Sequence, residues 1–271
     1  MYLYDFKYDE NSLSDFGFIV CEIDSDTRDS SKGAEIKFSL APIQYGKRMV
    51  KTGSKYESTL SASFKICRDP ELYDENHMAI SGQEFRMLER WLNRREFLWF
   101  RSYDQVDPDV EEAWFRATFT LSKYEIGGVT YAIELNMQTD SPFGYGDEVE
   151  ENLIFTSDNL TQSIADKNDE IGFTYPDVII TCSQSGDLVI RNETTGCAFS
   201  VNHCSKNEVI TQYGEPLILG TTLKDTHDIA NDFNYDWITI ANTFTERENV
   251  ITASAPCELT IRYHPILKET I

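Results

Sequence analysis

The stretch that decides the fold is Ser81–Arg101, SGQEFRMLERWLNRREFLWFR. It begins like a helix, because Ser81 is followed three residues later by Glu84, the spacing of a capping box. Apolar residues then recur at helical spacing on an otherwise charged surface, namely Phe85, Leu88, Trp91 and Leu92. The aromatic run Glu96–Phe100, directly afterwards, has the composition of a strand. We therefore expect one amphipathic helix that covers one face of a sheet, with Trp91 as its largest buried anchor.

The composition is that of a folded protein. The chain has 271 residues, of which 41% are hydrophobic and 13% aromatic, enough for one large domain or two ordinary ones. No segment approaches the roughly 20 apolar residues that span a bilayer. The first residues lack the basic and apolar regions of a secretory signal. We therefore expect a chain made and assembled in the cytoplasm, with no membrane partner.

The charge balance argues against binding to nucleic acid. Divided at Gly146, the first part has 17 basic and 25 acidic residues, a net charge of −8. The second part has 7 basic and 21 acidic residues, a net charge of −14, and the two sum to −22. Neither part offers the cationic surface that neutralises phosphates. We expect no sequence-specific nucleic-acid partner.

The sequence also lacks the motifs of catalysis. Walker A, GxGxxG, GxSxG and HExxH patterns are all missing from it. Its six cysteines have no CxxC spacing, which favours buried thiols over metal ligands in a reducing compartment. His203 and Cys204 form a possible ligand or nucleophile pair, but adjacent residues in a strand point to opposite faces. We therefore expect no enzyme, no catalytic residue, no metal and no cofactor.

The N-terminal half otherwise reads as strands. Aromatic residues alternate at Tyr2, Tyr4, Phe6 and Tyr8, which predicts a strand with one aromatic face. Trp114–Lys123 and Val129–Met137 predict a hairpin, because Gly127 and Gly128 lie between them.

One connection in this half is basic in an acidic chain. It runs from Gln44 to Lys55, between predicted strands at Ile36–Pro42 and Tyr56–Arg68. Its cations are Lys47, Arg48, Lys51 and Lys55. The connection is either the solvated tip of a hairpin or a loop that docks on an acidic neighbour.

A domain boundary is predicted at Gly146, where a proline, two glycines and a shift of charge coincide. Residues 1–146 then form one domain and residues 147–271 the other. Beyond the boundary, short alternating runs between Ile171 and Tyr263 are separated by Gly, Asn and Pro. This pattern predicts a β-sandwich, so the fold class is mainly β.

Aromatic side chains on the sandwich offer a second hypothesis. Tyr235 and Trp237, beside the polar loop Asp225–Asp236, are candidates for binding carbohydrate, because exposed aromatic rings can stack on sugars. They are weak candidates, because Trp237 alternates with Ile238 and Ile240 in a pattern that favours core packing.

The order of these elements resembles the distal tail proteins of long non-contractile-tailed bacteriophages. In the N-terminal half the resemblance lies in SLSDFGFIV, WLNRREFLWF and DSPFGYG, and in the C-terminal half in WITIANTF and NVITASAPCELTIRYHP. That family pairs an N-terminal belt domain, with one helix packed on a sheet, with a C-terminal galectin-like β-sandwich. The resemblance therefore implies a belt domain at residues 1–146 and a galectin-like domain at residues 147–271.

The resemblance implies a structural hub at the tail tip of a virion. Such proteins form a ring, usually a hexamer, that joins the tail tube protein to the tail-associated fibre or lysin protein and the adsorption apparatus. In some members the second domain anchors a receptor-binding protein. Within this scheme the strand with Tyr2, Tyr4, Phe6 and Tyr8 is a candidate ring-interface edge, and the basic loop is a candidate docking element. The alternative is a carbohydrate-binding β-sandwich protein with or without hydrolase activity, which the helix-bearing first half disfavours.

Overall fold

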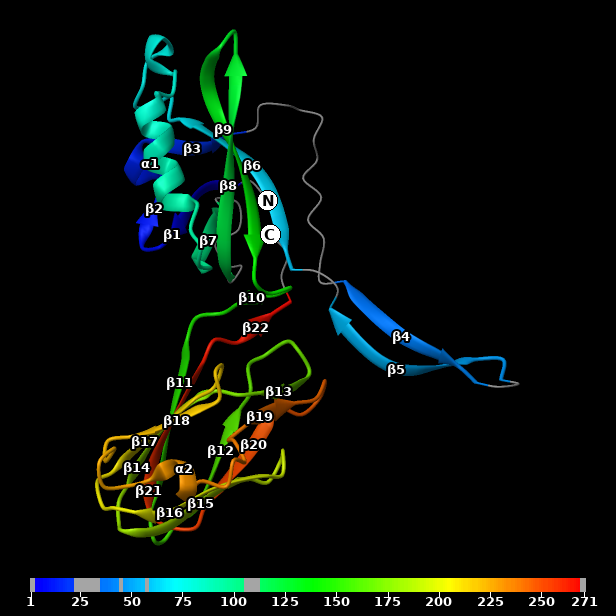
Figure 1. Cartoon of the computed structure of the whole chain (residues 1–271), viewed down its shortest axis with the longest axis vertical. Coiled ribbons are helices and arrows are strands. Elements are labelled where there is room, and N and C mark those ends of the chain that lie inside the picture. The colour runs from blue at the N-terminus through cyan, green and yellow to red at the C-terminus, as the bar shows by residue number, and fades with distance from the viewer. Residues whose placement is uncertain (1–2, 22–34, 44–45, 57–58, 105–112, 269–271) are drawn as a thin grey trace. The chain divides into compact units, whose positions relative to one another are not determined.

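The computed structural model describes residues 3–21, 35–43, 46–56, 59–104 and 113–268, which are mainly β (Figure 1). They form two compact units. The first contains the described residues up to Gly146 together with Leu267 and Lys268, and the second is Asp147–Ile266. No helix in these residues is long and apolar enough to cross a membrane.

The first unit is built on an antiparallel sheet with strand order β2-β1-β7-β8-β9-β6-β3. Its strands are β1 (Leu3–Tyr8), β2 (Asn11–Ser12), β3 (Phe18–Cys21), β6 (Ser61–Arg68), β7 (Leu98–Asp104), β8 (Trp114–Ile126) and β9 (Val129–Thr139). Two short strands add to it, because β10 (Gly144–Tyr145) pairs with both β8 and β22 (Ile266–Leu267). The 3-10 turns η1 (Leu13–Phe16) and η2 (Glu75–His77) complete the connections.

The predicted helix is confirmed as α1 (Gly82–Leu92). The capping box forms, since the Ser81 side chain accepts from the Glu84 backbone N–H and the Glu84 side chain accepts from the Ser81 N–H. Leu88, Trp91 and Leu92 are buried, so the apolar stripe faces the sheet as expected. The ring of Trp91 stacks on Phe6 of β1, with centroids 5.8 Å apart.

The core under α1 is rich in aromatic rings. Phe6, Phe100 and Phe119, from β1, β7 and β8, are all buried and in mutual ring contact. The predicted β8–β9 hairpin is also confirmed, and its turn requires glycine because Gly127 and Gly128 have φ of +61° and +81°.

The second unit is a β-sandwich, as predicted. One sheet has the order β11-β21-β14-β17-β18 and the other β12-β20-β15-β16. The first sheet consists of β11 (Val149–Phe155), β14 (Asp177–Cys182), β17 (Val209–Tyr213), β18 (Ile218–Thr221) and β21 (Cys257–Tyr263). The second consists of β12 (Thr161–Ala165), β15 (Gly186–Asn192), β16 (Cys197–Cys204) and β20 (Glu248–Ala253). A small pair, β13 (Gly172–Thr174) with β19 (Ile240–Asn242), and the one-turn helix α2 (Ile229–Asp232) lie outside these sheets.

One apolar core joins the two sheets of the sandwich. Ile180 and Leu259 reach it from the first sheet, and Ile190, Phe199 and Ile251 reach it from the second. Alternate residues of these strands are buried, which is the pattern of a strand with one face on a core.

The predicted basic loop is not a loop. The strands β4 (Ile36–Pro42) and β5 (Met49–Tyr56) form a separate two-stranded sheet (Figure 1). The predicted connection Gln44–Lys55 is therefore mostly strand. We call this hairpin the arm. The prediction failed because Gly53 lowers the strand propensity of this stretch, yet it pairs with Ser39 inside the arm.

Candidate assembly surface

The arm is a twisted antiparallel ribbon with one irregularity. Its pairing runs from Ile36 opposite Tyr56 to Pro42 opposite Met49. Between Ser39 and Leu40 the register shifts, so Thr52 is an extra residue in β5 and donates its hydroxyl to the Ser39 carbonyl over 3.1 Å. Such bulges increase the local twist of a ribbon.

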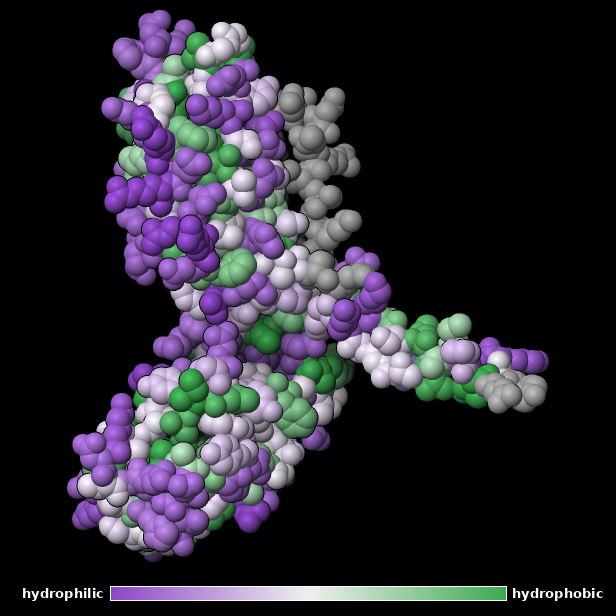
Figure 2. Space-filling model, viewed as in Figure 1, coloured by the Kyte–Doolittle hydropathy of each residue, from purple (hydrophilic) through white to green (hydrophobic). Residues whose placement is uncertain are grey.

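One face of the arm carries exposed apolar side chains. Residues two apart in a strand share a face, so Ile36, Phe38 and Leu40 point to the same side of β4, and Met49 joins them from β5. These four side chains are between 45% and 62% exposed. Figure 2 shows hydrophobic residues along the arm. Removing each of these side chains from water would contribute about 1 kcal/mol of stabilising free energy, at about 25 cal/mol per Å² of apolar surface buried.

The arm is also basic. Residues 36–56 contain five cations and no carboxylate, in a chain whose net charge is −22. Lys51 places its ammonium 5.0 Å from the centroid of the Phe38 ring. The apolar face and the positive charge therefore occupy the same ribbon, which suits an acidic partner with an apolar surface.

The base of the arm is attached to the first unit. Tyr56, the last residue of β5, packs edge-on against Phe143, with ring centroids 4.6 Å apart. Phe143 is buried. A two-stranded hairpin is marginally stable alone, so a partner that covers the arm also stabilises its fold.

The predicted docking residues all lie on the arm. Lys47 and Arg48 occupy its turn, while Lys51 and Lys55 lie in β5, and all four are exposed. Sequence reasoning found these cations but missed the apolar face beside them. The signal was the alternation of Ile36, Phe38 and Leu40 with polar residues, which indicates a strand without saying what covers it.

The predicted edge strand has two of its aromatic rings in the core. Phe6 and Tyr8 are fully buried, and burial raises the pKa of Tyr8 to about 12. Their side chains therefore cannot contact a neighbouring subunit. Tyr4 is 39% exposed, and Tyr2 lies outside the described residues. Among the described strands, β1 pairs with β7 on one side and with β2 only at its last two residues.

The two aromatic candidates for glycan binding differ in exposure. Trp237 is half-buried and packs edge-on against Phe233, 4.9 Å between centroids. Tyr235 is 65% exposed, and its hydroxyl donates to the Ala230 carbonyl over 2.9 Å. They therefore do not present a pair of parallel exposed rings.

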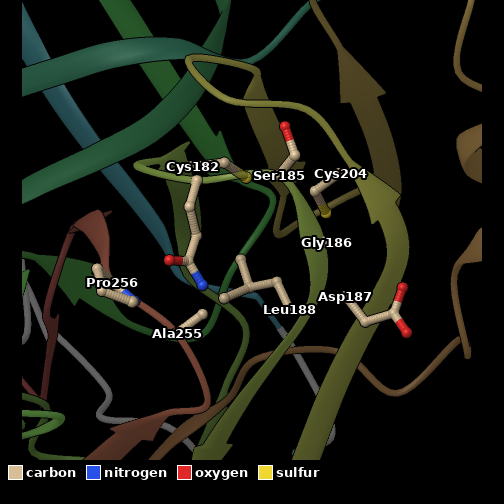
Figure 3. Close-up of a pocket in the computed structure, with 9 residues that line it drawn as sticks. Cys182, Ser185, Gly186, Asp187, Leu188, Cys204, Ala255 and Pro256 are labelled. Atoms are coloured by element: carbon tan, nitrogen blue, oxygen red, sulfur yellow. The ribbon is translucent and has the colours of Figure 1, made fainter. Parts of the chain in front are cut away.

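A small hollow in the sandwich is too small for a sugar. It lies beside β15 and is lined in part by Cys182, Asp187, Leu188 and Cys204 (Figure 3). Its free volume of about 10 Å³ holds one water at most. Within the described residues, no group of three or more His, Cys, Asp or Glu side chains is arranged to hold a metal ion.

Comparison with known proteins assigns the chain to a class. Residues 1–141 match the model of a family described as phage tail protein N-terminal domain, and residues 143–263 match one described as phage tail C-terminal domain. The chain therefore belongs to this family of phage tail proteins. No curated protein matches it.

A solved structure shares the fold over nearly the whole chain. It is the crystal structure of the SPP1 Dit (gp 19.1) protein, described as a paradigm of the hub adsorption apparatus in Gram-positive infecting phages. The two are 14% identical, the match covers 97% of this chain and 99% of that chain, and the TM-score is 0.65. The resemblance to distal tail proteins is thus confirmed at the level of the fold.

Proposed function

We propose that this protein is the structural hub of a phage tail tip. Copies of the chain close into a ring, a hexamer by analogy with distal tail proteins, and the ring joins the tail tube protein to the tail-associated fibre or lysin protein. A receptor-binding protein is a further candidate partner. In this proposal the chain is assembled in the host cytoplasm, resides at the tail tip and has no catalytic role.

The observation that carries this proposal is the arm. A hairpin that exposes Ile36, Phe38, Leu40 and Met49 to water is an unfavourable arrangement for a solitary protein. Its five cations favour an acidic surface, and another copy of this −22 chain is such a surface. Membership in the phage tail family supports the same conclusion.

Contact between an arm and a neighbouring copy is heterologous, because two different patches meet. Contacts of this kind close into rings when the rotation between copies allows it. The strand β1 remains a second candidate interface through its backbone and Tyr4, since Phe6 and Tyr8 are committed to the core.

Particle assembly tests this function. In phage carrying I36T, F38T, L40T and M49T together, we expect tails without a complete tip and a loss of infectivity. The control replaces exposed apolar residues of the second unit, I154T, F173T and F244S, where exposure is 58%, 67% and 88%. Normal tails from the arm variant would refute the role of the arm in the hub.

The cations are tested separately. Alanine at Lys47, Arg48, Lys51 and Lys55 removes four of the five charges of the arm and leaves its apolar face in place. We expect tail assembly to weaken and to become less sensitive to salt. Intact assembly in this variant would remove the predicted docking role of these residues.

A further inference from the structure

A buried histidine in the second unit joins two carboxylates. His227 is 7% exposed, and its Nδ1 lies 2.6 Å from Oε1 of Glu208, which is 1% exposed. Its Nε2 lies 3.3 Å from Oδ2 of Asp232 in α2. The imidazole therefore lies between two carboxylates, hydrogen-bonded to Glu208 through Nδ1, while its Nε2 has no hydrogen-bond partner among the described residues. The contact with His227 matters for Glu208, because an isolated buried carboxylate is costly.

The charged and titratable groups around His227 come from three elements. Glu208 precedes β17 and also accepts from the Thr221 hydroxyl and from the Ser205 backbone N–H. Asp232 belongs to α2 and also contacts Nδ1 of His203 over 3.0 Å. Cys204 of β16 supplies a buried thiol on the same side.

The protonation of this cluster follows from these contacts. Burial disfavours the charge on His227 and is the largest single influence, but Glu208, Cys204 and Asp232 together outweigh it, so the pKa of His227 is raised. For Glu208, burial acts in the opposite sense to its hydrogen bonds from Thr221, Ser205 and His227, and the pKa of Glu208 is lowered. The contact between the two groups therefore favours the charged form of each.

His227 is the most deeply buried side chain of the segment 222–232, in which Ile229 also packs against the core of the sandwich. Among residues 222–232, all of them described, His227 is the one buried side chain, and Ile229 is half-buried. The segment is fixed at its far end, where Phe233 packs on Phe199 and the Asn234 side chain bonds the backbone of β16. At its near end the Thr222 N–H donates to the Val209 carbonyl and its hydroxyl accepts from the Val209 N–H, while the Leu223 N–H donates to the Thr221 hydroxyl. His227 therefore lies in the stretch between two anchored ends.

We propose that residues 222–232 form a pH-sensitive flap, pinned to the sandwich by charged His227 and released when His227 loses its proton. Because the pKa of His227 is raised, its stabilisation is complete below the unfolded value of about 6.5 and disappears as the pH rises through the folded value. The lowered pKa of Glu208 makes its contribution complete above about 4.5 and lost as the pH falls. The flap is therefore tightest between about pH 4.5 and 6.5 and loosens as the pH rises through the folded pKa of His227. This inference does not depend on the proposed function.

Hydrogen exchange of the full-length protein tests the flap. Protection of peptides from residues 222–232 is measured between about pH 5.5 and 9.5, with labelling times scaled to the intrinsic exchange rate. We expect protection to fall by up to about tenfold per pH unit above the folded pKa of His227, which histidine NMR titration supplies. Peptides from β14 (Asp177–Cys182) serve as the internal reference. Protection of the flap that is independent of pH would overturn the proposal.

Variants test whether His227 holds the flap through its charge or only through its packing. H227N keeps a donor for Glu208 but cannot titrate, so its flap should be less protected at pH 6 and insensitive to pH. H203N changes an exposed imidazole that touches the same Asp232 and should retain the pH dependence. If H227N does not fold, E208Q should move the midpoint of flap release to lower pH. A wild-type pH dependence in H227N, or no shift in E208Q, would overturn the proposal.

Discussion

The indole N–H of Trp91 donates a hydrogen bond to the backbone carbonyl oxygen of Tyr8, with 3.0 Å between Nε1 and the oxygen. Both residues are buried, and they are 83 positions apart in the sequence. The bond joins α1 to β1, the strand whose aromatic rings form the core of the first unit. This polar contact therefore helps to fix the position of the helix on the sheet inside a largely apolar interface.

We predict that this hydrogen bond contributes measurably to the stability of the first unit. W91F keeps an aromatic ring but leaves the Tyr8 carbonyl without its donor, which should cost about 1–3 kcal/mol. W91A also creates a cavity and should cost about 3–5 kcal/mol. Urea unfolding followed by circular dichroism measures both. The control M87A, on the exposed side of α1, should change stability by less than about 0.5 kcal/mol, and equal effects of W91F and M87A would contradict the prediction.

The capping box gives a second prediction. S81A removes the acceptor for the Glu84 backbone N–H and should destabilise the first unit by about 1 kcal/mol. G82A is the matched control one residue further on, because a methyl group there meets no atom within 4 Å. Thermal unfolding should show a lower midpoint for S81A than for the wild type. G82A should show no such decrease. A midpoint unchanged in S81A would show that water replaces the cap.

Glu84 also makes the stability of the first unit depend on pH in the acidic range. Burial raises its pKa, but hydrogen bonds from Arg68 and Ser81 and the charge of Arg68 outweigh burial, so the pKa of Glu84 is lowered. Its stabilisation is therefore present above the unfolded value of about 4.5 and is lost as the pH falls through the folded value. The stability difference between the wild type and E84Q should be largest at neutral pH and should shrink towards about pH 3.

Denaturant unfolding over this pH range measures that difference. E89Q, on the exposed face of the same helix, is the control and should leave the pH profile of the wild type unchanged. An E84Q deficit that stays constant down to the lowest pH would contradict the assignment of the charge to Glu84.

Gly214 in the sandwich gives a prediction in which an added atom, rather than a lost interaction, causes the destabilisation. A Cβ at Gly214 would lie 2.0 Å from the Tyr175 carbonyl oxygen and 2.7 Å from the Pro176 carbonyl. Backbone must therefore move in G214A, and we expect a loss of about 1–3 kcal/mol in the second unit. G53A, whose Cβ would meet only the Ser39 side chain at 3.9 Å, is the control. Equal stability of the two variants would refute the close approach at Gly214.

The sequence predicted the elements whose signals are local. The helix followed from Ser81, Glu84 and the spacing up to Trp91, and the β8–β9 hairpin followed from Gly127 and Gly128. The strands of the sandwich core were visible because alternate residues are apolar. Each of these signals lies within one turn or one strand.

Two strands of the sandwich were missed. Residues Val149–Phe155 form β11, but the carboxylates of Glu150 and Glu151 obscure its alternating pattern, and the predicted runs began only at Ile171. Leu153 and Phe155 are buried while the charges lie towards solvent, so the strand is amphipathic. The neighbouring β12 (Thr161–Ala165) is short and largely polar, and its pairing with β20 is a long-range contact that no local pattern encodes.

The functional features depend on similar long-range relations. The cations of the arm were predicted, yet the exposure of Phe38 and Leu40 depends on the absence of a covering strand among the described residues. Glu208 and His227 are 19 positions apart and match no motif, so only the folded chain brings them together. Phe6 and Tyr8 looked available to a neighbour because a sequence does not distinguish the core face of a strand from an outer face.

The native mass of the full-length protein, compared with that of the arm variant I36T/F38T/L40T/M49T at equal concentrations, tests the central claim most directly. The hub account predicts a ring-sized species for the wild type, about six times 31.1 kDa, and a species of about 31.1 kDa for the arm variant. The control I154T/F173T/F244S should keep the mass of the wild type. Equal masses for the wild type and the arm variant up to the highest attainable concentration would contradict the claim that the arm assembles this protein into a ring.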